Sequence, residues 1–214
     1  QKAHGGLLQT VVAASFPDFT KPMTRRAVVG RIRIGFISSN FHWHSIFKTH
    51  GGFITELRRA YFEITTIHFG AKVDDATRRL EAASDHFFHW PDFRPEHVRA
   101  IGDMGLDVIV YPDLGMEPIT QALATLRLAP VQCNAGGHPV TSGLNTIDYF
   151  LSSDLMEAVG AEEHYSEELV RLPQLFTAYP RPDVGDPELP EALVGRSPTA
   201  RFVCLQSLYK LLPQ

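Results

Sequence analysis

Residues that could carry out chemistry gather in two short parts of the sequence. His42 and His44 lie two positions apart after an apolar run at residues 31–38, and His138 stands in a glycine-rich segment at residues 136–143. A neutral imidazole can take a proton from an attacking hydroxyl, because its unperturbed pKa is about 6.5. The spacing of His42 and His44 also suits two metal ligands or two structural histidines, so the spacing leaves all three roles open.

The segment GGHPVTSG at residues 136–143 has the composition of either a binding loop or a tight turn. Its two adjacent glycines let the backbone come close to another group, and Pro139 restricts the geometry that follows. Thr141 and Ser142 add hydroxyls that a polar ligand can contact. The candidates for such a loop are therefore His138, Pro139, Thr141, Ser142 and Gly143.

Two further residues are candidates by position. Asp113 follows a short apolar run, from where its carboxylate could bind a sugar hydroxyl, orient a base or cap a turn. Lys210 could meet a diphosphate or lie on the surface of a helix. We expect no metal site, because no third His, Cys or Asp has the required spacing, and we expect Cys133 and Cys204 to be buried thiols.

Strand-like and helix-like runs alternate along the chain, which predicts the fold class. Strands are expected at residues 31–38, 61–69, 86–90, 107–111 and 169–172, with two more around the glycine-rich loop. Helices are expected at residues 52–59, 74–83, 95–104, 118–128 and 162–168. This pattern predicts an α/β, Rossmann-like parallel sheet, in which ligands bind beyond the carboxyl ends of the strands. The candidate residues follow strands, so we expect them along one edge.

The chain divides into four expected parts. Residues 1–30 form a polar lead segment, and residues 31–179 form the Rossmann-like lobe. Residues 180–199 are rich in Pro and Gly and are expected to be a linker. Residues 200–214 read as the start of a second lobe.

Composition excludes several classes of protein. The net charge is −4, and no apolar run approaches the ~18 residues of a membrane span, so we expect a cytoplasmic protein with no membrane partner. The few basic residues near the amino terminus lack interleaved aromatic residues, so we expect no nucleic-acid partner. The absence of GxGxxG, P-loop and GxSxG motifs argues against dinucleotide-binding proteins, Walker-type nucleotidases and serine hydrolases.

Six segments in register resemble the catalytic region of bacterial Spindly-like and O-linked N-acetylglucosamine transferases. They are RIRIGFISSNFHWHS, YPDLGM, LRLAPVQCNAGGHPVTSG, IDYFLSSDLME, HYSEELVRLP and CLQSLYKLLP. The resemblance implies a GT-B glycosyltransferase, which has two Rossmann-like lobes, an active site in the cleft and often preceding tetratricopeptide repeats. The chain looks like the amino-terminal lobe of such an enzyme, truncated at the start of the carboxy-terminal, donor-binding lobe.

The resemblance also implies a reaction and the residues that carry it. The reaction is an inverting transfer of N-acetylglucosamine from UDP-GlcNAc to a Ser or Thr hydroxyl of a protein acceptor, with no cofactor and no required metal. His44 matches a histidine proposed as base or acceptor-positioning group, and Asp113 matches a polar strand-end position. The loop from His138 to Gly143 matches a loop at the cleft. Gln206 and Lys210 match a motif at the donor diphosphate, where we expect Lys210 to stabilise the leaving group.

The resemblance leaves alternatives and two departures. Many relatives carry a Trp where this chain has Gly136, just before the loop, and an Asp where it has Asn40. The sugar could be glucose or fucose instead of N-acetylglucosamine. The chain could also be a noncatalytic Rossmann-like module that binds a protein, or another GT-B enzyme such as a nucleotide-sugar epimerase. We expect the 214-residue chain alone to bind donor weakly or not at all and to have no transferase activity, because most donor-binding elements would follow it.

Overall fold

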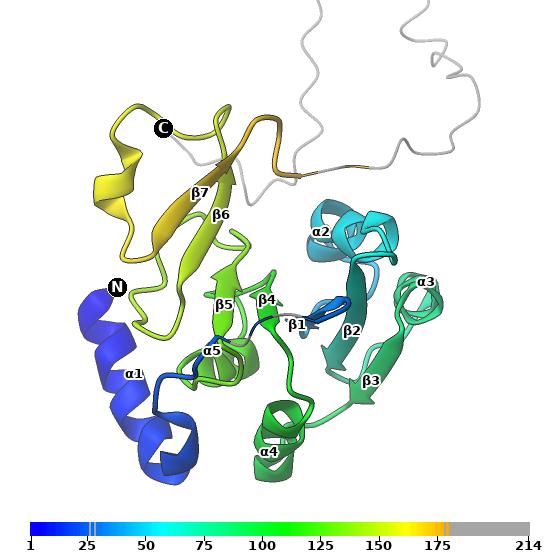
Figure 1. Ribbon diagram of the computed structural model, residues 1–214, viewed down its shortest axis with the longest axis horizontal. Helices are drawn as coiled ribbons and strands as arrows, with labels where there is room; N and C mark the ends of the chain where they lie inside the picture. The colour runs from blue at the N-terminus through cyan, green and yellow to red at the C-terminus, as the bar shows by residue number, and fades with distance from the viewer. Residues whose placement is uncertain (26, 28, 178, 180–214) are drawn as a thin grey trace, which may run out of the picture. The chain divides into compact units, whose positions relative to one another are not determined.

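The computed structural model describes residues 1–25, 27, 29–177 and 179, and their centre is a seven-stranded sheet (Figure 1). The order of the strands is β3-β2-β1-β4-β5-β6-β7, and every neighbouring pair is parallel. The strands are β1 (Ile32–Ser38), β2 (Phe62–Phe69), β3 (His86–Trp90), β4 (Val108–Tyr111), β5 (Val131–Asn134), β6 (Tyr149–Ser153) and β7 (Glu168–Leu172). The predicted Rossmann-like parallel sheet is therefore confirmed.

Apolar residues cover both faces of the central strands, because successive side chains of a strand point to opposite faces. Ile37 and Ile109 join one buried cluster, whereas their neighbours Phe36 and Val110 join the other. The first cluster also contains residues of α4 (Pro95–Asp103) and α5 (Pro118–Ala124), and the second contains residues of α2 (Ser45–Glu56) and α3 (Asp75–Ala83). Helices on both faces explain why these strands read as almost continuous apolar runs.

Three predictions of local structure need correction. The helix expected at residues 52–59 is α2, which begins earlier, at Ser45, and includes the Gly51–Gly52 pair that lowers helix propensity. The helix expected at residues 162–168 is wrong: a short 3-10 helix, η2, covers Ala161–His164, and β7 begins at Glu168. The polar lead segment, to which no helix or strand was assigned, contains α1 (Lys2–Ser15) and a 3-10 turn, η1 (Pro17–Phe19).

The direction of the chain changes between β1 and β4. From β1 the chain runs outward through β2 to β3, returns to β4 beside β1, and then runs outward the other way. At such a switch point the loops after the two strands diverge and leave a crevice. The loops after β1, β4 and β5 lie at this edge of the sheet and carry the residues predicted to form a site.

Some predictions lie partly or wholly outside the described residues. Residues Gln1–Pro180 form one compact unit, whereas Cys204, Gln206 and Lys210 lie beyond the described part, so the predicted linker and second lobe stay predictions. Cys133 is a buried free thiol, as expected, and burial raises its pKa to about 12. Among the described residues, no helix is both long and apolar enough to cross a membrane.

Candidate functional site

The loop after β1 is held in place by a buried carboxylate. Asp113, in the turn after β4, has no exposed surface and accepts three hydrogen bonds through Oδ2. The donors are the hydroxyl of Ser38 at 2.7 Å, the backbone N–H of Ser39 at 2.9 Å and the side-chain amide of Asn40 at 3.2 Å. Burial raises the pKa of Asp113, and these hydrogen bonds oppose the rise. Because it lies beneath the surface, Asp113 positions this loop and does not itself face a sugar.

The loop places His44 at the start of α2. His44 is the N-cap of this helix, and its Nδ1 accepts a hydrogen bond from the backbone N–H of Ile46 at 3.2 Å. An imidazole nitrogen that accepts a hydrogen bond cannot carry the proton, so the neutral ring is protonated on Nε2. Nε2 is therefore a hydrogen-bond donor in this conformation. Of the two roles expected for His44, this geometry favours positioning an acceptor or donor oxygen over abstraction of a proton.

Four histidine rings form a row across the carboxyl ends of β1, β2 and β3. The ring centroids of His42 and His44 are 5.5 Å apart, those of His42 and His68 are 6.3 Å apart, and those of His68 and His89 are stacked at 5.3 Å. The pKa of His42 is lowered by burial, and the charges of Lys72 and the neighbouring histidines lower it further. His42 is therefore neutral at pH 7.

The row of histidines does not form a metal site by its geometry. Nε2 of His68 donates to the carbonyl of Lys72 at 2.9 Å, and Nε2 of His89 donates to the carbonyl of Gly70 at 2.8 Å. Within the described part of the chain, no group of three or more His, Cys, Asp or Glu residues is arranged to hold a metal ion. The expectation that the reaction needs no metal stays a prediction.

A second buried carboxylate, which the sequence analysis missed, holds the glycine-rich loop. Glu167, just before β7, is 6% exposed and accepts hydrogen bonds from Thr141 Oγ1 at 2.6 Å and from the backbone N–H of Ser142 at 2.8 Å. The hydroxyl of Ser142 also donates to it. Burial alone raises the pKa of Glu167, but these donors outweigh it and hold the pKa below the ordinary value. Both hydroxyls of the loop therefore bind a protein carboxylate.

The glycines of the loop allow the close contacts that their composition predicted. A Cβ added at Gly137 would lie 2.1 Å from the carbonyl oxygen of Pro112, so only glycine fits between the loop and the turn after β4. At Gly143, where φ is +71°, a Cβ would lie 2.6 Å from the carbonyl carbon of Gln1. The loop thus packs against the β4–α5 connection at one end and against the start of α1 at the other.

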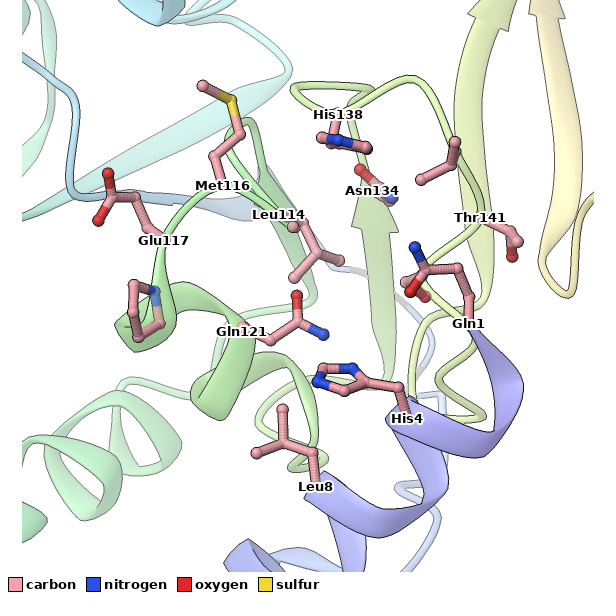
Figure 2. A pocket seen from close by; sticks show the side chains of 14 residues that line it. Gln1, His4, Leu8, Leu114, Met116, Glu117, Gln121, Asn134, His138 and Thr141 are labelled. Atoms are coloured by element: carbon pink, nitrogen blue, oxygen red, sulfur yellow. The ribbon is translucent and has the colours of Figure 1, made fainter.

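A pocket of about 540 Å³ lies between α1, the start of α5 and the glycine-rich loop (Figure 2). Of the predicted site residues, His138, Thr141 and Ser142 line this pocket, whereas His44, Asp113, Pro139 and Gly143 do not. The other lining residues are Gln1, His4, Leu8, Leu114, Gly115, Met116, Glu117, Pro118, Gln121, Asn134 and Val140. The predicted residues thus fall into two groups at the same edge: one at the start of α2 and one at this pocket.

Signals for the missed residues were weak in the sequence. His4 and Gln121 line the pocket from helices that lie far apart in the chain, and no spacing rule connects them. Glu167 is one of several acidic residues at positions 162–168, and nothing in their order distinguishes the buried one. Only its place directly before an apolar strand hinted that its side chain could be drawn inside.

A parallel Rossmann-like sheet whose polar loops meet beyond β1, β4 and β5 defines an α/β protein whose candidate site lies at the carboxyl edge of the sheet, where proteins of this architecture bind ligands. The family model described as Glycosyl transferase family 41 matches residues 2–180, and the chain belongs to this family. This finding confirms the family that the six sequence segments resemble.

Two curated relatives support the assignment. The chain is 24% identical over 220 residues to the probable UDP-N-acetylglucosamine–peptide N-acetylglucosaminyltransferase SEC of Arabidopsis thaliana, covering 96% of this chain and 22% of the relative. It is 30% identical over 158 residues to the UDP-glucose:protein N-beta-glucosyltransferase of Actinobacillus pleuropneumoniae serotype 5b, covering 72% of this chain and 24% of the relative. The chain therefore spans about a quarter of the length of these relatives.

A solved structure shares the fold. A mutant of the O-GlcNAc transferase of Thermobaculum terrenum matches with a TM-score of 0.67 and 24% sequence identity, covering 86% of this chain and 40% of the solved chain. At this identity the match shows that the two chains have the same architecture.

Proposed function

We propose that the protein transfers N-acetylglucosamine from UDP-GlcNAc to Ser or Thr hydroxyls of a protein acceptor, with inversion at the anomeric carbon and without a required metal. The observation that carries this proposal is the placement of His44. A buried carboxylate fixes the loop, the N-cap bond fixes the ring at the start of α2, and no described residue hydrogen-bonds to Nε2. The family membership and the named relatives support the reaction class.

The proposed reaction is a single displacement. The acceptor oxygen forms a bond to the anomeric carbon while the bond to the diphosphate oxygen breaks, and the hydroxyl proton passes from the new glycosidic oxygen to an oxygen of the departing diphosphate. Negative charge develops on the departing diphosphate, where preorganised positive charge lowers the barrier. We assign this task to Lys210, with Gln206 beside it, both in the part of the chain that the structure does not describe. The Nε2–H of His44 orients a substrate oxygen.

Preorganisation is the contribution of the described residues to this reaction. The ring of His44 cannot rotate without losing its bond to Ile46, and the loop cannot shift without breaking the bonds to Asp113. Fixed groups of this kind need no reorganisation when charge develops. We propose that the 214-residue chain by itself does not turn over the donor, because it spans only about a quarter of the length of the named glycosyltransferases.

The test uses His44→Asn in the protein as its own organism makes it. Asn is among the best N-cap residues, so this variant keeps α2 capped while it removes the imidazole. We expect the rate of sugar transfer, measured by mass spectrometry of the acceptor, to fall at least about 100-fold, which is the effect of losing one preorganised hydrogen-bond donor. The unfolding midpoint should not change. Lys210→Ala should abolish transfer. Full activity in both variants would contradict the assignment.

A second donor has a specific observation in its favour. The relative that is 30% identical to this chain is named for UDP-glucose and for transfer to nitrogen. The same mass-spectrometric assay should therefore include UDP-glucose and map the modified side chain. A hexose on an Asn residue, with no modified Ser or Thr, would replace our choice of sugar and acceptor.

A further inference from the structure

The pocket between α1, α5 and the glycine-rich loop contains a buried amide donor that has no partner among the described residues. Asn134, at the end of β5, has no exposed surface, and its Oδ1 accepts a hydrogen bond from the backbone N–H of Gly136 at 3.0 Å. This bond fixes which way the carboxamide faces, because the oxygen must be the atom nearest to Gly136. Its Nδ2 donor is buried and unsatisfied within the described part of the chain.

A buried acceptor borders the same pocket. Gln121 lies on α5, and its Oε1 is also buried without a hydrogen bond to any described residue. Figure 2 shows the carboxamides of Asn134 and Gln121 at the same hollow, with His4 and His138 beside them. A buried polar atom without a partner lowers stability, so native proteins rarely keep two of them in one place without a function. One donor and one acceptor are the complement of a single amide group.

The charge of the lining argues for a neutral occupant. Among the described residues that form the pocket there is no lysine or arginine, and Glu117 is acidic. A nucleotide diphosphate would need a positively charged side chain or a metal ion to offset its negative charge. Leu8, Leu114 and Met116 give the pocket an apolar wall that can receive a side chain. A volume of about 540 Å³ is within the range of sites that bind small molecules or short peptide segments.

We propose that this pocket binds a polypeptide segment through one peptide group, whose carbonyl accepts from Asn134 Nδ2 and whose N–H donates to Gln121 Oε1. That the segment belongs to the acceptor protein rests on the function proposed above. His44 does not line the pocket. Asn134 and Gln121 therefore act as positioning residues, which hold the acceptor chain away from the reacting atoms and fix the length of chain that reaches them.

A binding experiment on the 214-residue chain tests this without any transferase activity. The probe is N-acetyl-alanine-N′-methylamide, a neutral molecule with two peptide groups, titrated against the ¹⁵N side-chain amide signals of Asn134 and Gln121. We expect saturable shifts of both signals. Methyl β-glucoside should leave them in place. Saturable shifts with the glucoside instead, or no saturation with the peptide probe at tens of millimolar, would overturn the proposal.

Two variants separate binding from structure. Gln121→Met removes the unsatisfied oxygen and keeps the length of the side chain, so it should weaken binding of the probe about tenfold and raise Tm. Asn134→Asp keeps the acceptor for Gly136 but turns the donor into an acceptor, and it should abolish binding if its spectrum shows a folded chain. Gln174→Glu, an exposed residue outside the pocket, is the matched control. Unchanged probe affinity in Gln121→Met would contradict the proposal whatever becomes of Asn134→Asp.

In the protein as its own organism makes it, the same residues have a kinetic signature. Gln121→Met should raise the KM for the acceptor about tenfold and change kcat much less, because a positioning residue acts on binding of the acceptor. If the titration shows that the pocket binds peptide but the KM for the acceptor does not change, the peptide in the pocket is not part of the acceptor protein. If no sugar transfer is detected at all, the proposed function fails, and the titration still decides whether the pocket binds peptide.

Discussion

The loop after β1 and the glycine-rich loop after β5 are held in the same way, but the pKa values of the carboxylates that hold them shift in opposite directions. Each is held by a buried carboxylate from another part of the chain, Asp113 in the first and Glu167 in the second. Burial dominates at Asp113 and raises its pKa, whereas hydrogen bonds dominate at Glu167 and lower its pKa. The sign of the shift therefore follows from the balance of burial and hydrogen bonds: Oδ1 of Asp113 has no partner among the described residues, whereas both oxygens of Glu167 accept hydrogen bonds.

The largest expected effect comes from adding a second carboxylate to the deeper site. Asn40 is 6% exposed and donates to Asp113 and, at 3.4 Å, to Glu117, so Asn40→Asp places a carboxylate against two others. We expect the free energy of unfolding at pH 7, measured in urea, to fall by about 3 kcal/mol. The exposed Asn145→Asp is the matched control.

A double variant that exchanges the side chains of residues 40 and 113 tests the same explanation further. The double variant Asn40→Asp, Asp113→Asn keeps one carboxylate and one carboxamide, so it should recover most of the lost stability. A double variant as unstable as Asn40→Asp would show that the direction of the hydrogen bonds matters more than the number of charges.

The next effect is at the shallower carboxylate. Glu167→Gln removes the charge to which Thr141 and Ser142 donate, and we expect the free energy of unfolding at pH 7 to fall by about 2 kcal/mol. The exposed neighbour Glu168→Gln should change it by less than about 0.5 kcal/mol. Equal losses in the two variants would show that Glu167 does not hold the loop.

The pH dependence of the two sites should have opposite signs. The lowered pKa of Glu167 means that its contribution is present above the ordinary value of 4.5 and is lost as the pH falls through the folded pKa, so wild type and Glu167→Gln should converge in acid. The raised pKa of Asp113 gives stability that is present below its ordinary value of 3.8 and is lost as the pH rises through the folded pKa. The advantage of wild type over Asp113→Asn should therefore shrink with rising pH. Parallel profiles would contradict the comparison.

The smallest expected effect is the loss of one hydroxyl. Thr141→Val removes the hydroxyl that donates to Glu167 Oε2, and we expect the free energy of unfolding to fall by about 1 kcal/mol. The pKa of Glu167, measured by NMR titration, should move closer to its ordinary value. Ser166→Ala removes a longer bond of 3.0 Å to the same oxygen and should move the pKa less. A larger effect from Ser166→Ala would mean that Thr141 is not the main donor.

Much of the fold could be predicted because the spacing of apolar residues and the composition of each segment are local properties of the sequence. The strands from β1 to β5, and the placement of the loops after them along one edge, followed from apolar runs and from the rule for parallel sheets. The start of α2 could not be predicted, because a histidine cap and an internal Gly51–Gly52 pair are both poor local signals. The position of α1 depends on tertiary packing, which an amphipathic pattern this weak does not reveal.

The site was predictable in place and not in detail. His44, Asp113 and the glycine-rich loop do lie at the expected edge. The hydroxyls of Thr141 and Ser142 were expected to face a ligand, but the carboxylate of Glu167, 26 and 25 residues further along the chain, binds them. Such partners are invisible to spacing rules, because the fold brings them together. The same holds for Asn134 and Gln121, whose unsatisfied atoms can be recognised only when every neighbour is known.

The contact between α1 and the glycine-rich loop joins two segments that line the pocket. A Cβ at Gly5 would lie 2.6 Å from the carbonyl oxygen of Gly143, and one at Gly143 would meet the backbone of Gln1. Backbone therefore touches backbone at this point, with no side chain to act as a spacer. The absence of a Cβ at both glycines thus lets α1 lie directly against the loop, and we expect Gly5→Ala to push apart the two segments that line the pocket.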